Sequence, residues 1–182
     1  MCSSATRLVA RYPRKAKVSD LLTVHNIDQG YCLATWDRVL IQLWRGPATL
    51  HAAEQWLEAG EAFLRQSGNQ PCCSLSIVES RSPPPTEKVR LAMAAGFRGL
   101  APRMRHQIVV AEGSVIRSAL VRGVGLALSS MSSSSLPLEY VASLDDAAVT
   151  LAPHLSPAAG GPEGLKSAVS NLRSQVDRYS PR

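Results

Sequence analysis

The 182-residue sequence lacks the features that mark secreted and membrane-spanning proteins. None of its apolar runs approaches the roughly 20 residues that a helix needs to cross a bilayer, so we expect no membrane span. The basic side chains between Arg7 and Lys17 are not followed by the apolar stretch of a secretory signal peptide. We therefore expect a cytoplasmic protein.

Motifs for catalysis or cofactor binding are missing as well. The sequence has no phosphate-binding P-loop, no Gly-x-Ser-x-Gly and no His-Glu-x-x-His motif, and Leu128 stands where a loop beginning at Gly123 would need its third glycine. Neither the four histidines nor the four cysteines have the spacing of a metal site. We predict no catalytic residue, no cofactor and no metal, and we expect reduced, unreactive thiols.

The net charge of +6 is spread unevenly along the chain. Residues 1–30 hold five basic and two acidic side chains and residues 156–182 hold four and two, whereas residues 31–155 hold eleven and ten. A nucleic-acid-binding domain normally concentrates its basic side chains on one folded surface. With the excess placed in the two tails, we expect no nucleic-acid partner.

Alternating and short apolar runs predict the strands of one α/β domain. A hairpin of strands at 31–36 and 39–44 turns at Asp37 and Arg38. Further strands are expected near 73–78, 106–111 and 138–142.

Helical periodicity fills the intervals between these strands. Thr49 and Thr86 are placed to cap helices that begin at about residues 50 and 87. The stretch from Ser143 to Asp146 has the pattern of a capping box, with Ser143 as the cap, and opens a last helix expected from 147 to about 155. A further helix is expected over 116–131, with one packing stripe whose small residues allow close approach to a sheet; its members are Ile116, Ala119, Leu120, Gly123, Val124, Ala127 and Met131.

The three parts of the chain differ in character. Residues 1–28 are expected to form a basic arm, 29–155 the α/β domain, and 156–182 a linker followed by a short amphipathic helix. That helix carries a heptad-like stripe that could dock on its own domain, pair with a second copy or bind a partner. The stripe, and hence the candidate oligomerisation site, consists of Leu165, Val169, Leu172 and Val176.

The predicted order β-β-α-β-α-β-α-β-α, with about five strands in a mixed sheet and about four helices, resembles the STAS fold of anti-sigma-factor antagonists. The most similar local stretch is Ser143-Leu-Asp-Asp-Ala-Ala, which leads into the last helix of the domain. The resemblance implies a non-enzymatic regulatory module of bacterial signalling that binds other proteins. Some STAS domains are switched by phosphorylation at the start of the second helix, where this sequence has three prolines and lacks the preceding Asp.

These observations lead to a functional hypothesis for the loop at 80–86 and the helix after it. We expect a protein partner, of unknown identity, to bind at Ser82, Thr86, Glu87, Val89, Arg90 and Met93. The resemblance makes Thr86 the candidate phospho-acceptor, although its hydroxyl could serve only as a helix cap. The alternative is a module that binds an apolar or anionic small molecule, with Trp36, Trp44 and Trp56 as candidate pocket walls. An enzyme that uses Cys72 or a histidine has the least support.

Overall fold

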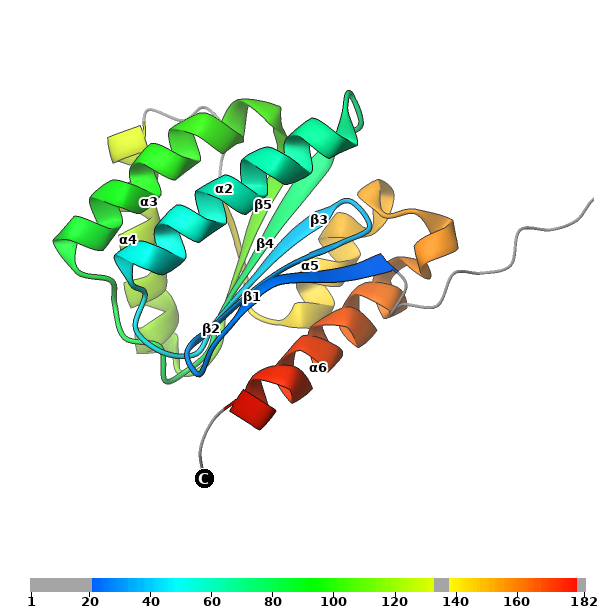
Figure 1. Cartoon of the computed structure of the whole chain (residues 1–182). Coiled ribbons are helices and arrows are strands. Elements are labelled where there is room, and N and C mark those ends of the chain that lie inside the picture. Colours follow the sequence, from blue (N-terminus) through cyan, green and yellow to red (C-terminus); the bar gives the residue numbers. More distant parts are fainter. Residues whose placement is uncertain (1–20, 133–137, 180–182) are drawn as a thin grey trace, which may run out of the picture.

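The computed structural model describes residues 21–132 and 138–179, and they form one mixed sheet with helices on both faces (Figure 1). The expected basic arm lies, up to residue 20, outside the described residues. The part of the chain that the structure describes holds six strands and five α-helices, which confirms the α/β class predicted from the sequence. Within the described ranges, no helix combines the length and the apolar character needed to span a membrane.

The strands follow one another across the sheet in the order of the sequence, β1-β2-β3-β4-β5-β6. The first three, β1 (Leu22–Ile27), β2 (Tyr31–Trp36) and β3 (Val39–Trp44), pair antiparallel. The others, β4 (Cys72–Val78), β5 (Met104–Ala111) and β6 (Leu138–Val141), continue in parallel from β3. All six residues of β3 are buried, as expected for a strand covered on both faces.

The first face of the sheet is covered by the three crossover helices, α2 (Leu50–Ser67), α3 (Glu87–Leu100) and α4 (Val115–Ser132) (Figure 1). Each joins a parallel strand to its next neighbour in the same direction across the sheet, and since such crossovers are right-handed, all three helices lie on one side. The opposite face is covered by α5 (Leu144–Leu151) and α6 (Gly161–Tyr179). The sheet therefore separates two apolar clusters.

Strand β1 was not predicted, because its apolar residues do not alternate regularly. Leu22 and Val24 are two positions apart, but Ile27 follows after three. A bulge between Val24 and Asn26 shifts the pairing with β2 by one residue. Val24 and Ile27 therefore pack on the same side of the sheet, against the cluster under α5 and α6, although their spacing breaks the period of two. This strand occupies the end of the range assigned to the basic arm.

The predicted helix caps are confirmed at two of three positions. The hydroxyl of Thr49 accepts a hydrogen bond from the amide of Ala52 at 3.1 Å, and that of Ser143 accepts one from the amide of Asp146 at 3.1 Å. Thr86 precedes α3 as expected, but its side chain makes no capping hydrogen bond.

Helix α6 docks on its own domain, which was one of the three alternatives left open by its sequence. Its four stripe residues are at most 1% exposed, inside the cluster on the second face of the sheet. The carboxylate of Asp37, in the β2–β3 turn, accepts a hydrogen bond from the amide of Ser156 at 2.7 Å and so fixes the chain leading into this helix. With Leu165, Val169, Leu172 and Val176 buried in this way, a second copy cannot reach them while the fold is intact.

Candidate functional site

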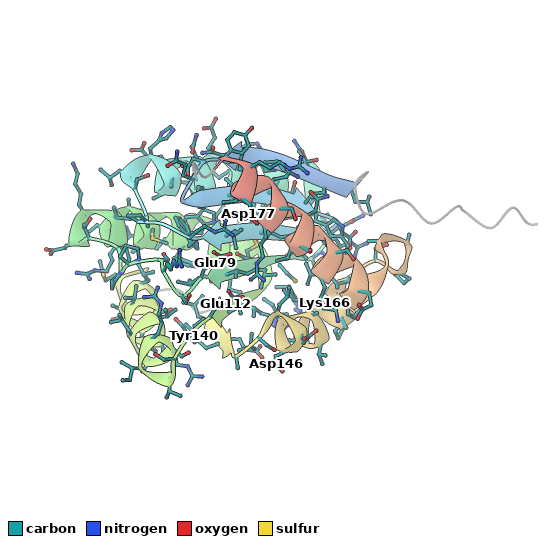
Figure 2. All side chains as sticks on the ribbon, turned by 90° about the horizontal axis from the view of Figure 1, so that it is seen from below. Glu79, Glu112, Tyr140, Asp146, Lys166 and Asp177 are labelled. Atoms are coloured by element: carbon teal, nitrogen blue, oxygen red, sulfur yellow. The ribbon has the colours of Figure 1, made fainter. Side chains whose placement is uncertain are left out.

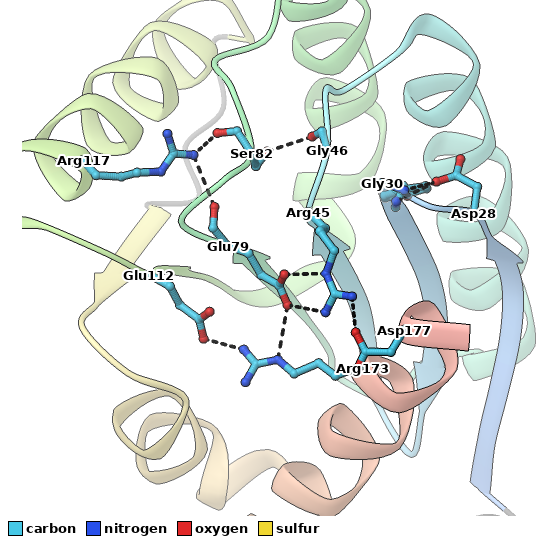
Figure 3. A network of polar contacts seen from close by, with 11 residues as sticks. Asp28, Gly30, Arg45, Gly46, Glu79, Ser82, Glu112, Arg117, Arg173 and Asp177 are labelled. Atoms are coloured by element: carbon cyan, nitrogen blue, oxygen red, sulfur yellow. Dashed lines mark hydrogen bonds and ion pairs between the residues drawn. The ribbon is translucent and has the colours of Figure 1, made fainter. Parts of the chain in front are cut away.

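Charged side chains gather at the carboxyl ends of three neighbouring parallel strands (Figure 3). Arg45 follows β3, Glu79 follows β4 and Glu112 follows β5. Arg173 and Asp177 of α6 reach the same edge (Figure 3), and Figure 2 shows Asp177 on the side of Glu79. In open α/β sheets this edge is where ligands commonly bind. To act on a ligand at this edge, a charged group must not already be paired within the protein.

The charges at this edge are paired with one another. Arg45 forms a two-pronged ion pair with Glu79, with Nε–Oε2 and Nη2–Oε1 distances of 2.7 and 3.2 Å, and its Nη1 lies 2.5 Å from Asp177. These hydrogen bonds, first of all that with Glu79, raise the pKa of Arg45 above its ordinary value. Arg173 lies 3.5 Å from Glu79 and donates to Glu112. The network fastens α6 across the sheet edge and leaves none of these five groups unpaired for chemistry.

The loop at 79–86 is fixed by hydrogen bonds to its neighbours. The Ser82 hydroxyl donates to the carbonyl of Gly46 at 2.9 Å, and the Arg117 guanidinium donates to the carbonyls of Ser82 and Glu79 (Figure 3). Gly46 itself packs against Gly30, where a Cβ on Gly46 would come within 2.9 Å of the Gly30 Cα. The loop therefore has a defined shape, to which its three prolines add stiffness.

Only part of the predicted partner site is accessible. Ser82, Val89 and Met93 are buried, and the two apolar residues belong to the cluster beneath α3. Thr86 and Glu87 are exposed and Arg90 is half-buried. A partner that binds the folded chain can reach the second group of three and not the first.

Among the residues that the structure describes, the thiols and histidines form no assembled catalytic or metal site. Cys32, Cys72 and Cys73 are free and buried, and burial raises the pKa of Cys32 to about 12 and that of Cys73 to about 11, so these two are not thiolates at neutral pH. The rings of His106 and His154 stack with centroids 4.6 Å apart. In the described ranges, no three His, Cys, Asp or Glu residues are grouped closely enough to hold a metal ion.

Helix α4 does not bury the stripe that its sequence suggested. Ile116 is 83% exposed, and Gly123, expected to lie close to the sheet, has no atom within 4 Å of the position of a Cβ. The residue that does touch the sheet closely is Gly125, which lies against Tyr140 of β6. The expected packing stripe was wrong because α4 covers a short edge strand of four residues, which contacts only the inner side of the helix.

The outer side of α4 is a continuous run of apolar and small side chains, which we name the α4 face. Val115, Ile116 and Leu126 are 87%, 83% and 67% exposed, and Leu120 is 46% exposed. The exposed small residues Ala119, Gly123 and Ala127 lie at intervals of four and therefore on one side of the helix. Single exposed apolar residues are ordinary, but four large ones on one helix form a patch typical of interaction surfaces.

The two helices at this side of the molecule carry an excess of basic side chains. Helices α3 and α4 together carry five basic side chains and one acidic one, whereas the neighbouring α2 carries three glutamates and one arginine. The near-neutral total for residues 31–155 therefore conceals a separation of charge between helices. The basic residues are Lys88, Arg90, Arg98, Arg117 and Arg122.

Comparisons with known proteins give no relative from which a function could be transferred. No family model, no curated protein and no solved structure matches this chain.

Proposed function

We propose that this chain is a non-enzymatic regulatory or scaffolding protein that binds another protein through the α4 face and the exposed start of α3. The observation that carries the proposal is the group of large apolar side chains that α4 presents to solvent. Removing such side chains from water drives protein association. The STAS resemblance, and the bacterial signalling role that it implies, agree with this proposal.

The chemistry of the face favours an acidic partner with apolar contact residues. A two-fold pairing of copies through this face would bring two α3–α4 pairs with an excess of basic side chains together, and like charges oppose such pairing. The chain's own N-terminal residues are also basic, so they too are a poor match. A partner with acidic side chains around an apolar strip matches both the apolar patch and the basic side chains of α3 and α4.

The small residues of α4 favour a helix as the contacting element. Without large side chains at Ala119, Gly123 and Ala127, a partner backbone can approach the α4 backbone closely. The larger Ile116 and Leu126 would flank this strip and contact the sides of the incoming helix. We therefore propose an acidic amphipathic helix as the segment that binds.

Phosphorylation at Thr86 belongs to the same proposal. Its hydroxyl is exposed at the N-terminus of α3 and makes no capping hydrogen bond. A phosphate there would be stabilised by the helix dipole and would add negative charge to a basic surface. The expected effect is weaker binding of an acidic partner, which a Thr86→Glu variant would reproduce in part.

The proposal can be tested by comparing two matched surface variants. Leu126→Asp changes the α4 face, and Val149→Asp makes the same kind of change at an exposed position of α5 on the other side of the sheet. Tagged full-length chains carrying either change would be used to capture proteins from lysate of the cells that produce this protein. Cross-linking with mass spectrometry would then identify the partner segment that lies against α4.

We expect a protein with an acidic segment cross-linked to α4 to be captured by the wild type and by Val149→Asp, and to be lost with Leu126→Asp. Equal capture by all three chains would refute the proposal. Binding to anionic phosphatidylglycerol vesicles that is lost with Leu126→Asp, without protein capture, would instead assign this face to a membrane surface.

A further inference from the structure

Strand β1 is the outermost strand of the sheet, and within the described ranges no further strand pairs with its outer edge (Figure 1). A free strand edge presents unpaired backbone N–H and C=O groups, which proteins usually protect with charged side chains, with proline or with a covering segment. The sequence of β1 has no proline, and its one titratable side chain is His25, whose pKa is lowered by burial. The bulge after Val24 is its only protective feature, so residues 22–24 form a regular, unprotected stretch of edge.

The two faces of the sheet differ in chemistry at this edge. On one face, Leu22 and Val24 are only partly buried and pack against the apolar cluster under α5 and α6. On the other face, His25 of β1 and Glu58 of α2 line a hollow of about 280 Å³. The three tryptophans that were candidate pocket walls lie in the two apolar clusters instead. A strand added at this edge therefore needs apolar side chains towards α6 and polar side chains towards α2.

The polar side favours positive charge. Helix α2 exposes Glu54, Glu58 and Glu61 along one side, because residues three and four positions apart share a helix face. Glu61 lies 3.7 Å from Arg65, whereas Glu54 and Glu58 form no ion pair with any residue that the structure describes. A second copy paired edge to edge would bring two such helices to the same face of a joined sheet, and their like charges would oppose the pairing. The occupant that fits this edge is a basic, extended segment.

Residues 6–12 of this chain have the required pattern. The run Thr-Arg-Leu-Val-Ala-Arg-Tyr places Arg7 and Arg11 at alternate positions of one set and Leu8, Ala10 and Tyr12 in the other. In an extended strand these two sets point to opposite faces of the sheet. The run is therefore basic on one face and apolar on the other, and the proline at position 13 ends it.

The length of the chain allows the run to reach the edge. Residues 13–21 link it to β1, and these nine residues span up to about 30 Å when extended, more than the roughly 20 Å length of β1. Along a strand, Arg7 and Arg11 would lie about 14 Å apart, close to the roughly 10 Å that separates Glu54 from Glu61 along α2. A short tether of this kind also gives an effective concentration of about a millimolar, which favours pairing within one chain.

We propose that residues 6–12 pair antiparallel with the outer edge of β1 and extend the sheet by one strand. Tyr12 then lies beside Leu22 and Ala10 beside Val24 on the α6 side. On the α2 side, Arg11 reaches the hollow lined by Glu58. This edge of the sheet is the one opposite to β6 and α4, so the inference does not depend on the proposed function of the α4 face.

Amide hydrogen exchange of the full chain, followed by NMR, tests the pairing. Alternate amides of residues 7–12 should exchange at least about tenfold more slowly than in a free peptide of residues 1–20, because they donate to β1. Leu8→Asp places a charge on the apolar side and should return these amides to the rates of the peptide. Ala16→Asp makes the same kind of change in the linking residues and should leave the protection intact.

Exchanging charges tests which side of the strand faces α2. Arg11→Glu should lower the protection about two- to fivefold, as expected when an exposed ion pair is replaced by two like charges. Adding Glu58→Arg to the same chain should restore the protection. Lys17→Glu, with the same change of charge in the linking residues, is the matched control and should have no effect.

Three results would overturn the inference. Exchange at the rates of the free peptide throughout residues 7–12 would show that the run does not pair with β1. Equal protection in the wild type and in Arg11→Glu would reject the contact with α2. Protection that is lost on dilution, together with a dimer in sedimentation, would assign the edge to residues 6–12 of a second copy.

Discussion

Two glycines in α4 experience opposite surroundings, although they are only two residues apart. A Cβ on Gly123 would meet no atom within 4 Å. A Cβ on Gly125 would lie 1.4 Å from the Tyr140 hydroxyl oxygen and 2.7 Å from the ring carbon that bears it. The same substitution, Gly→Ala, should therefore change stability in different ways at the two positions.

The expected size of the difference follows from two effects. Alanine stabilises a helix interior by about 0.8–1.0 kcal/mol relative to glycine, so Gly123→Ala should raise the free energy of unfolding by about 1 kcal/mol. Gly125→Ala gains the same amount but forces Tyr140 out of its place, and overpacking typically costs about 1–3 kcal/mol. The two variants should differ by about 1–3 kcal/mol, with Gly125→Ala the less stable.

Urea unfolding followed by tryptophan fluorescence measures this difference, because Trp36, Trp44 and Trp56 are all buried. As a control, Gly125→Ala should become stabilising in a Tyr140→Ala background, where the next nearest atom is a methyl carbon of Leu138 at 3.4 Å. If Gly123→Ala and Gly125→Ala changed stability by the same amount with Tyr140 present, the packing of α4 on β6 described above would be refuted.

Three further predictions concern the rest of the fold. Glu79→Gln should lower the free energy of unfolding by about 1–3 kcal/mol, because Arg45 and Arg173 lose a half-buried carboxylate. Asp177→Asn, at a side chain that is 65% exposed, should lower it by less than about 0.5 kcal/mol. Urea unfolding measures both losses, and equal losses would contradict the central role of Glu79. In the same assay, Leu172→Ala should lower the free energy of unfolding by about 2–5 kcal/mol, and Ser170→Ala, at an exposed position, should leave it almost unchanged. If Leu172→Ala left the free energy of unfolding unchanged, α6 would not dock on the sheet. Burial, and then the nearby positive charges, lower the pKa of His154 in the folded chain. As the pH falls, His154 is therefore protonated in the unfolded chain before it is protonated in the folded one, and the free energy of unfolding should decrease below about pH 6.5. His154→Gln should reduce that fall between urea midpoints measured at pH 7.5 and 5.5, and an unchanged pH dependence would reject the assignment.

Much of the fold could be predicted from the sequence because its signals are local. The hairpin turn at Asp37 and the caps at Thr49 and Ser143 involve contacts among residues at most a few positions apart. The missed strand β1 is the exception that shows the limit. Its bulge is stabilised by pairing with β2, and periodicity along β1 alone does not reveal it.

The candidate site was harder to predict. A charged residue follows each of the three predicted parallel strands, at Arg45, Glu79 and Glu112, and this pattern could have indicated a cluster at one sheet edge. That α6 completes the cluster through Arg173 could not be inferred, because the sequence leaves open where a helix after a linker docks. The apolar stripe of that helix is equally compatible with its own domain and with a partner.

The sequence by itself determined the α/β class, most of the strands and helices, and the order in which they follow one another, because periodicity and capping depend on neighbouring residues. Only the tertiary structure decided which apolar side chains are buried. Helix α4 is apolar around much of its circumference, and the short edge strand β6 covers one side of it and leaves Ile116 and Leu126 in solvent. Likewise, the hollow between β1 and α2 exists because segments distant in the sequence meet there, and no local pattern specifies a space between them.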